Sequence, residues 1–216
     1  MAVVVGVAFQ RPFGGGFAAV GGDGDGGVLA LEIGDVGLDD FFVVAACADS
    51  DDDAVHVEGH ALVGAAGFFF FCVGENVLRT PDLFAEIKQR GHAVGNHTMC
   101  HANGFKYTTD EYIRLVDEAD TLIKSPFFRP PYGRIKPAQY KLLKKRYRFV
   151  MWDVITRDYN ANLKPEKIVA IVKRYVRNGS VIVFHDSIKA QKNVFAALPQ
   201  AIEYLQKEGY RFELIK

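Results

Sequence analysis

Apolar and polar positions follow a regular pattern over residues 77–216. Apolar residues spaced three and four apart predict amphipathic helices, and short apolar runs between them predict buried strands. Capping residues, prolines and glycines mark where several of these elements begin and end. We expect helices at 81–90, 109–125, 135–146, 165–177 and 193–207, and strands at 92–97, 127–128, 148–154, 181–184 and 210–215.

Strand and helix thus alternate about five times, which is typical of an α/β domain with a parallel sheet and right-handed crossovers. The periodicity does not separate an open sheet from one closed into a barrel. In either form, functional side chains gather where strands end and loops begin. Five candidates fall at or just after an expected strand end: His97, Arg129, Asp153, Asp158 and His185.

The first third of the chain has a different composition. Residues 1–72 contain no Lys, Thr, Asn, Tyr or Trp, whereas the remaining 144 residues contain 37 of them. Gly, Ala, Val, Asp and Glu fill 49 of these 72 positions, and codons beginning with G encode all five. We interpret this segment as a wrong reading frame or as misassigned residues, with a genuine low-complexity extension as the alternative. The chain divides into 1–67, expected to hold a first strand and helix, and a catalytic region at 68–216.

Composition limits the class of protein. The formal net charge is zero, but residues 1–72 carry a net charge of −10 and residues 73–216 a net charge of +10. Three cysteines do not form a disulfide framework. No apolar run reaches the ~18 residues that span a bilayer, and no signal peptide is apparent. Cell envelope and cytoplasm both remain open as locations, and the number of subunits is undetermined.

Two histidines spaced four apart, His97 and His101, can present their rings on one face of a turn. Neutral imidazole suits Zn²⁺ and similar divalent ions, and a catalytic zinc site uses three protein ligands plus an open position. The pair supplies two ligands. Taken alone, the spacing is also compatible with a structural role, and Cys100 between the histidines fits a small core residue better than a ligand.

Arginine and a third histidine complete the candidate chemistry. Arg129 precedes two prolines, which end its strand, and it can pair with a carboxylate such as Asp158 or Asp153. His185 closes the apolar run 181–184, where it can serve as a general acid or as a buried structural residue. Asp186 can orient His185 or cap the next turn. Two aromatic residues near these positions fit a core or groove wall, Trp152 and Tyr159.

Together, four motifs resemble the polysaccharide deacetylases, the NodB-homology group also called carbohydrate esterase family four. They are the segments at 91–101, 128–133, 152–154 and 182–186, and the resemblance covers about residues 68–216. It implies a single-domain, distorted (β/α) barrel of about seven parallel strands. It also implies removal of acetyl groups from N-acetylglucosamine polymers or oligomers, with xylan esters as a less common substrate. The implied cofactor is one divalent metal, zinc above all, with cobalt, nickel or manganese as alternatives.

The resemblance also assigns roles to individual residues. His97 and His101 match the two metal histidines, and His185 matches the general acid. Arg129 matches the arginine that steadies the catalytic base. The remaining matches are the family's tuning aspartate, Asp158, and the residue whose backbone N–H faces the oxyanion, Tyr132. A tryptophan usually stands where this chain has Tyr159.

The family's opening motif, Thr-Phe-Asp-Asp-Gly-Pro, is absent from this chain. In the family its first aspartate is the base and its second is the third metal ligand. By spacing the motif belongs near Cys47, where Asp49, Asp35 and the pair Asp39-Asp40 are the available carboxylates, none in a matching context. Two hypotheses follow: a metal-dependent deacetylase, or a relative that binds glycan or metal without turnover.

Two other functions are disfavoured by the pattern. The glycine runs at 14–16 and 21–27 do not follow a strand and open a helix, as a nucleotide-binding loop requires. The basic residues of the C-terminal region are scattered over helix faces, which indicates a solvated surface rather than a nucleic-acid interface. The expected partner is therefore an acetylated polysaccharide or oligosaccharide.

Overall fold

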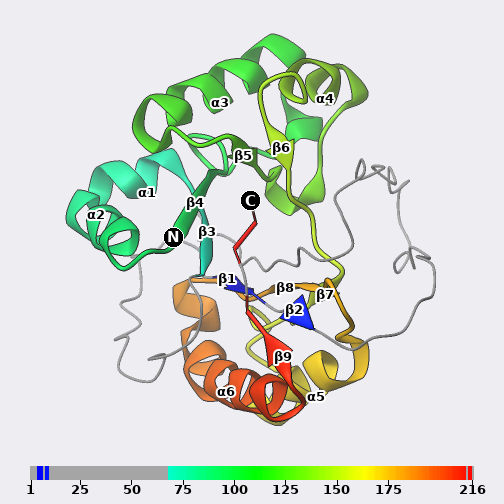
Figure 1. The fold of residues 1–216 in the computed structure, drawn as a ribbon. Coiled ribbons are helices and arrows are strands. Elements are labelled where there is room, and N and C mark those ends of the chain that lie inside the picture. The colour runs from blue at the N-terminus through cyan, green and yellow to red at the C-terminus, as the bar shows by residue number, and fades with distance from the viewer. Residues whose placement is uncertain (1–3, 7, 10–67, 213, 216) are drawn as a thin grey trace.

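The structure is a computed structural model that describes residues 4–6, 8–9, 68–212 and 214–215. The expected first strand and helix, and the candidates Asp35, Asp39 and Asp49, lie outside the described residues. Figure 1 shows two groups of strands, each covered on its outer side by helices. One group precedes residue 150 and the other is built mainly from the C-terminal third of the chain.

Four parallel strands form the first group, in the order β3-β4-β5-β6. Phe70 of β3 pairs with Val94 of β4, and Phe128 of β5 pairs with Phe149 of β6. The strands are β3 (Phe69–Cys72), β4 (Ala93–Asn96), β5 (Phe127–Phe128) and β6 (Arg148–Phe149). The helices are α1 (Gly74–Arg79), α2 (Pro81–Gln89), α3 (Thr109–Ile123) and α4 (Pro137–Leu143).

The second group contains a three-stranded sheet in the order β1-β8-β7 and a separate pair β2-β9. β7 and β8 are parallel, as expected, whereas β1 pairs with β8 and β2 with β9 in antiparallel fashion. The strands are β1 (Val4–Gly6), β2 (Ala8–Phe9), β7 (Val154–Ile155), β8 (Val181–Val183) and β9 (Tyr210–Arg211). Two helices cover this group, α5 (Pro165–Tyr175) and α6 (Ile188–Lys207).

Local sequence signals explain several helix ends. Pro81 occupies the first turn of α2, where its missing N–H is not needed, and Gly91 follows the helix with φ +80°. Thr108 and Glu111 form the expected capping box at α3: the threonine oxygen accepts from the Glu111 N–H, and the Glu111 carboxylate accepts from the Thr108 N–H at 2.8 Å. The helix expected at 193–207 begins earlier, because Ser187 caps α6, and it continues through Pro199.

The expected strand at 148–154 is wrong as a single element. Residues 148–149 belong to β6 in the first group, and residues 154–155 belong to β7 in the second. Between them, the carbonyls of Val150 and Met151 accept hydrogen bonds from the Arg129 side chain at 2.9 and 2.8 Å. These carbonyls therefore bond to a side chain where the chain crosses from one sheet to the next.

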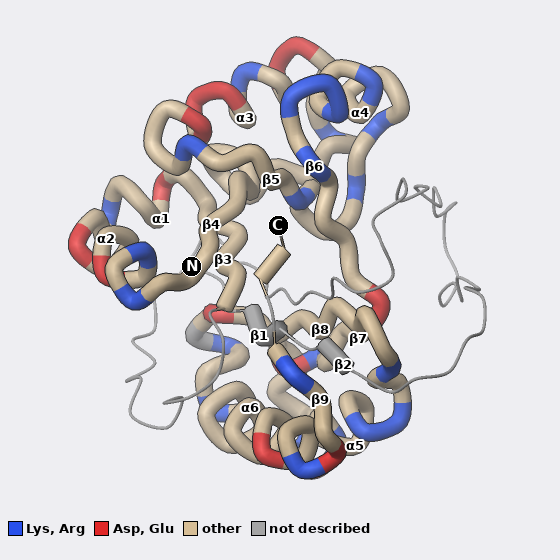
Figure 2. Tube along the Cα trace, viewed as in Figure 1, with Lys and Arg blue, Asp and Glu red and all other residues tan. Residues whose placement is uncertain are grey.

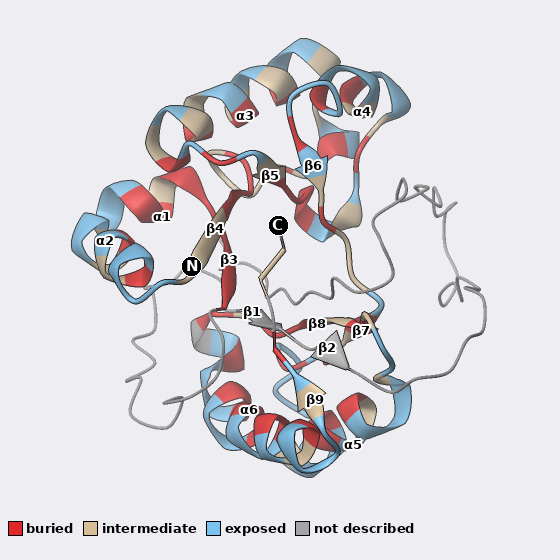
Figure 3. Ribbon diagram, viewed as in Figure 1, coloured by how far each residue is buried: buried red, intermediate tan, exposed pale blue. Residues whose placement is uncertain are grey.

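A continuous core joins the two groups of strands. Buried strand residues such as Phe69, Phe71 and Ile182 belong to one apolar cluster with Ile168 of α5 and Leu198 of α6. Figure 3 shows the buried positions on the strands and on the inner faces of the helices. A smaller cluster lies under α3 and α4 around Tyr112, Phe128, Leu143 and Tyr147. Within the described residues, no helix has the length and apolar content needed to cross a membrane.

The outer face of α4 and the turn after it are basic. Exposed cations occur at Lys141, Lys144, Lys145 and Arg146, and Figure 2 shows them around α4 and the start of β6. Arg146 forms an exposed salt bridge with Asp117 of α3. Exposed pairs of this kind contribute about 0–1 kcal/mol, so these residues mainly form a solvated surface.

Candidate active site

Polar side chains gather at the carboxyl ends of the parallel strands. His97 directly follows β4, and Arg129 directly follows β5. Asp158 lies three residues after β7, and His185 lies two residues after β8. Loops at this end of a parallel sheet carry the functional residues of α/β proteins. The fold therefore brings four of the expected residues to one end of the sheets.

His97 and His101 face each other, with ring centroids 5.1 Å apart. His97 is 2% exposed, and its Nδ1 lies 2.5 Å from the carbonyl oxygen of Arg129. Since that carbonyl can only accept, Nδ1 carries the hydrogen and Nε2 keeps its lone pair. Burial first, and then the nearby His101 and Arg129, lower the pKa of His97 well below its ordinary value. A buried neutral imidazole with a fixed tautomer is suited to bind a metal through Nε2.

The loop between the histidines has an unusual backbone held by Asn96. Thr98 and His101 have φ angles of +67° and +54°, in the left-handed region that is unfavourable for residues other than glycine. The Asn96 side chain accepts from the Thr98 N–H at 2.9 Å and donates to the Val116 carbonyl at 2.9 Å. The sequence interpretation missed this role of Asn96, although a buried asparagine inside an apolar strand is a signal for it.

The two histidines supply two of the three protein ligands that a catalytic zinc site uses. Two neutral imidazoles on one turn provide nitrogen ligands, and such sites use a third protein ligand. Among the residues that the structure describes, no group of three His, Cys, Asp or Glu side chains could hold a metal ion. Cys100 packs against the core cluster under α3 and α4, in keeping with the expected core role.

Arg129 is 1% exposed. Backbone carbonyls and two aromatic rings hold its guanidinium in place. Besides its bonds to the two carbonyls after β6, the guanidinium carbon lies 4.6 Å from the Phe71 ring centroid and 5.4 Å from that of Trp152. The expectation that Asp158 or Asp153 pairs with Arg129 is wrong, because both carboxylates are bonded elsewhere. The Asp153 carboxylate accepts from Ser180 Oγ at 2.9 Å and from the Val181 N–H at 2.7 Å.

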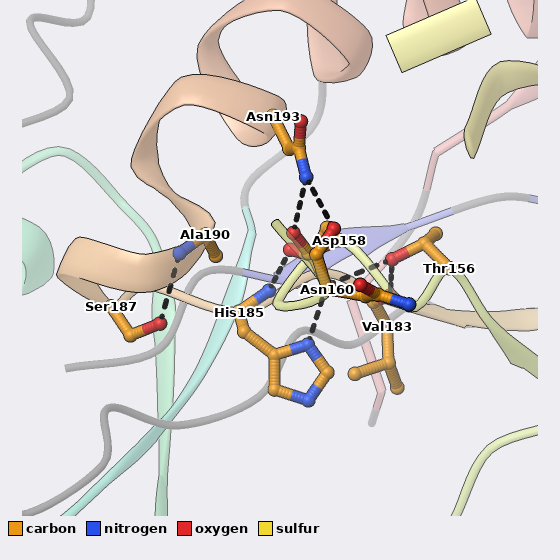
Figure 4. A network of polar contacts seen from close by, with 8 residues as sticks. All are labelled: Thr156, Asp158, Asn160, Val183, His185, Ser187, Ala190 and Asn193. Atoms are coloured by element: carbon orange, nitrogen blue, oxygen red, sulfur yellow. Dashed lines mark hydrogen bonds and ion pairs between the residues drawn. The ribbon is translucent and has the colours of Figure 1, made fainter. Parts of the chain in front are cut away.

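Asp158 and His185 form a buried carboxylate–imidazole pair (Figure 4). The Asp158 Oδ1 atom lies 2.7 Å from His185 Nδ1, and its Oδ2 accepts from the His185 backbone N–H at 2.6 Å. The Asp158 side chain is 0% exposed and the His185 side chain 20% exposed. Both contacts fix the imidazole with Nδ1 toward the carboxylate, which leaves Nε2 available for proton exchange. Asp158, and not Asp186, therefore orients His185, and Ser187 supplies the cap of α6.

The two histidine sites are electrostatically coupled, since the charge of His185 is among the influences that lower the pKa of His97. Aromatic rings form the rim around them. Tyr132 has φ +59° and its ring centroid lies 4.6 Å from that of His101. The Tyr159 ring meets His185 edge-on at 4.8 Å. Both tyrosines are exposed, at 57% and 44%. One end of the molecule thus carries the His97–His101 pair and, as a third imidazole, His185 with its carboxylate partner. Two exposed tyrosine rings lie beside them.

His92 has a structural role, since its Nδ1 accepts from the Phe68 N–H at 3.1 Å. His56 and His60 lie outside the described residues. Asn193 of α6 was missed by the sequence pattern, although its side chain bonds to the loop that carries Asp158. The expected helix start at 193 obscured it, because Asn193 lies in the second turn of α6 rather than at the N-terminus.

Comparison with known proteins identifies the family. A family model described as polysaccharide deacetylase matches residues 65–150. A peptidoglycan-N-acetylglucosamine deacetylase of Bacillus cereus is 34% identical over 152 residues, which cover 66% of this chain and 70% of that relative. The chain belongs to the polysaccharide deacetylase family. It spans 54% of another deacetylase of that name from Bacillus cereus, at 31% identity over 66% of this chain.

Solved structures of polysaccharide deacetylases confirm the distorted (β/α) barrel. The crystal structure of a peptidoglycan N-acetylglucosamine deacetylase superposes with a TM-score of 0.70 at 28% identity, covering 80% of this chain and 86% of that one. A family-four pseudoenzyme from Bacillus anthracis superposes with a TM-score of 0.65 at 20% identity, covering 81% of this chain and 64% of that one. At that lower identity the likeness concerns the fold alone.

Proposed function

We propose that this protein is a hydrolase that removes acetyl groups from N-acetylglucosamine units of glycans with the help of one divalent metal ion. The observation that carries the proposal is the Asp158–His185 pair, held at 2.7 Å on the same end of the sheets as the imidazoles of His97 and His101. Membership of the polysaccharide deacetylase family and the named activity of the relatives support the same reaction.

His97 and His101 would hold the metal, with zinc as the first expectation and cobalt, nickel or manganese as alternatives. A bound divalent ion lowers the pKa of water toward ~7 and polarises a carbonyl oxygen. A third ligand and a catalytic base are needed as well, and the family motif assigns aspartates to both roles. Asp35, Asp39 and Asp49 remain the candidates for those two roles.

His185 would act as the general acid. Its Nδ1 hydrogen points at Asp158, so Nε2 is the atom that gives a proton to the departing nitrogen as the amide C–N bond breaks. The products are a free amine on the sugar and acetate, so that one water is consumed for each acetyl group removed.

Arg129 and Tyr132 would have supporting roles. The resemblance assigns Arg129 to steadying the carboxylate base, and its burial against Phe71 keeps the guanidinium in one place. The resemblance assigns the Tyr132 backbone N–H to the developing oxyanion, where a fixed donor lowers the barrier. The left-handed conformation of Tyr132 sets the direction of that N–H group.

The substrate is proposed to be an acetylated glycan such as peptidoglycan or a chitin-like oligomer. Exposed Tyr132 and Tyr159 flank the two histidine sites and offer flat apolar faces to sugar rings. Incubation of the zinc-loaded protein with acetylated chitin oligomers, peptidoglycan and acetylated xylan tests this. We expect acetate and free amine in equal amounts from an N-acetylated glycan. Absence of acetate from all three substrates, with metal bound, contradicts the proposal.

A non-catalytic relative is the second candidate, because the Thr-Phe-Asp-Asp-Gly-Pro motif is absent from the chain. Loss of a general base costs ~10²–10⁴-fold in rate, and loss of a ligand weakens the metal site. Sequencing the coding region and measuring the intact mass distinguish the two candidates. A restored Asp-Asp pair near residue 47 supports the enzyme, whereas a mass matching the printed sequence supports binding without turnover.

A further inference from the structure

Asn193 joins helix α6 to the loop that carries Asp158. The side chain is 5% exposed, and its Nδ2 donates to the backbone carbonyl of Asp158 at 2.8 Å and to that of Asn160 at 3.1 Å. Figure 4 shows the amide pointing from α6 onto this loop, on the opposite side from the His185 ring. Both amide hydrogens of one side chain are thus used by two carbonyls of the same loop.

The loop needs such support because its own backbone is strained. Arg157 has φ +58°, a left-handed conformation that costs a residue other than glycine stability. Within the loop, the Asn160 N–H donates to the Arg157 carbonyl at 3.0 Å and the Leu163 N–H donates to the Asn160 carbonyl at 2.9 Å, but neither bond involves the Asp158 carbonyl. The carbonyl of the buried Asp158 would lose a hydrogen bond without the asparagine, and buried polar groups without partners are costly.

Asn193 and His185 also belong to one continuous segment. Ser187 begins α6 two residues after His185, and its Oγ accepts from the Ala190 N–H. The helix therefore holds Asp158 from its backbone side through Asn193. His185, which lies just before the helix, donates from its backbone N–H and its Nδ1 to the Asp158 carboxylate. The relative position of carboxylate and imidazole is set from both sides of the loop.

We propose that Asn193 is a positioning residue that acts through Asp158 to hold the Asp158–His185 pair in register. This inference rests on the proposed function in one respect, that His185 acts as the acid. Among the described residues, the Asp158 carboxylate and the Tyr159 ring face His185, and the charge of His185 acts on His97. Of these, Asp158 is the one that Asn193 contacts.

The test replaces Asn193 with leucine, whose side chain has the same branched arrangement of four heavy atoms and no hydrogen-bond donor. We expect kcat to fall on the order of 10-fold with KM within about 2-fold, because residues that support a catalytic group from behind set the geometry of that group. Gln200→Leu, an exposed amide on the same helix that bonds to the Ala196 carbonyl, is the matched control and should change none of these quantities.

A double-variant cycle separates positioning from general stabilisation. If Asn193 acts through Asp158, Asn193→Leu should lower kcat little further in an Asp158→Asn background. Additive losses, or a folded Asn193→Leu protein with the kcat of the wild type, overturn the inference. Should the leucine variant not fold, Asn193→Ser, which keeps a smaller polar group, undergoes the same comparison.

A second readout does not need turnover. The Nδ1 hydrogen of His185 should give a protected, downfield ¹⁵N-coupled NMR resonance in the wild type, and this resonance should broaden or shift in the Asn193 variant but not in the Gln200 control. An unchanged resonance counts against the inference. If the wild type releases no acetate, the proposed function fails, while this resonance still decides the role of Asn193.

Discussion

Replacement of Asp158 by asparagine is the sharpest single change that the structure offers. The Asp158 side chain is fully buried and receives both the Nδ1 hydrogen and the backbone N–H of His185. Asparagine keeps the shape but has one acceptor oxygen and one NH₂ group. One of the two His185 donors then faces another donor, so the ring must change tautomer or move.

The size of the effect follows from the loss of a charge-assisted hydrogen bond. Such bonds contribute about 1.5–3 kcal/mol, and about 1.4 kcal/mol corresponds to a tenfold change. We therefore expect kcat to fall about 10-fold to 100-fold with little change in KM.

The assay is acetate release from an N-acetylated oligosaccharide across a pH series, with the folded state checked by thermal unfolding. Asp153→Asn is the matched control: this carboxylate also lies at a strand end, but it bonds to Ser180, Val181 and Arg177. The control should lose stability and keep the wild-type kcat. Wild-type kcat at every pH in the Asp158 variant would refute a catalytic role for the pair.

Three further changes test the framework. Gly104→Ala places a Cβ 2.6 Å from the Arg134 carbonyl oxygen, and this overpacking should cost about 1–3 kcal/mol in urea unfolding; an unchanged midpoint contradicts the close approach. Thr108→Ala removes the cap of α3 and should cost about 1 kcal/mol, a Tm drop of roughly 2–4 °C by calorimetry. Burial and Arg90 lower the pKa of His92 in the folded protein. The unfolded chain therefore takes up that proton first, and Tm should fall as the pH drops below about 6.5. His92→Asn should flatten this slope.

Helices and their ends could be predicted from the sequence because their signals are local. Pro81 at the start of α2 and the Thr108 capping box at the start of α3 act within one helical turn, so no distant residue determines where these helices begin. The strand expected at 148–154 failed for the opposite reason. Its break depends on Arg129, distant in sequence, which bonds to the carbonyls of Val150 and Met151. A continuous apolar run does not reveal a bond of this kind.

The candidate site could be predicted as a set of residues but not as a set of pairs. Spacing placed His97 beside His101 and both at a strand end. The partner of Asp158 could not be predicted, because Arg129 and His185 are both chemically suitable. The structure decides between them: the Arg129 side chain bonds to carbonyls where the chain crosses between the sheets, and His185 bonds to Asp158. Asn193 carried no signal, since an amide that bonds to main-chain carbonyls follows no side-chain pattern.

Zinc titration of metal-free protein, with acetate release measured after each addition, tests the central claim most directly. We predict that activity rises to a plateau at one zinc per chain and that the His97→Ala/His101→Ala protein stays inactive throughout. Turnover that is independent of zinc, or a double variant that responds like the wild type, would contradict the assignment of these two imidazoles to a catalytic metal.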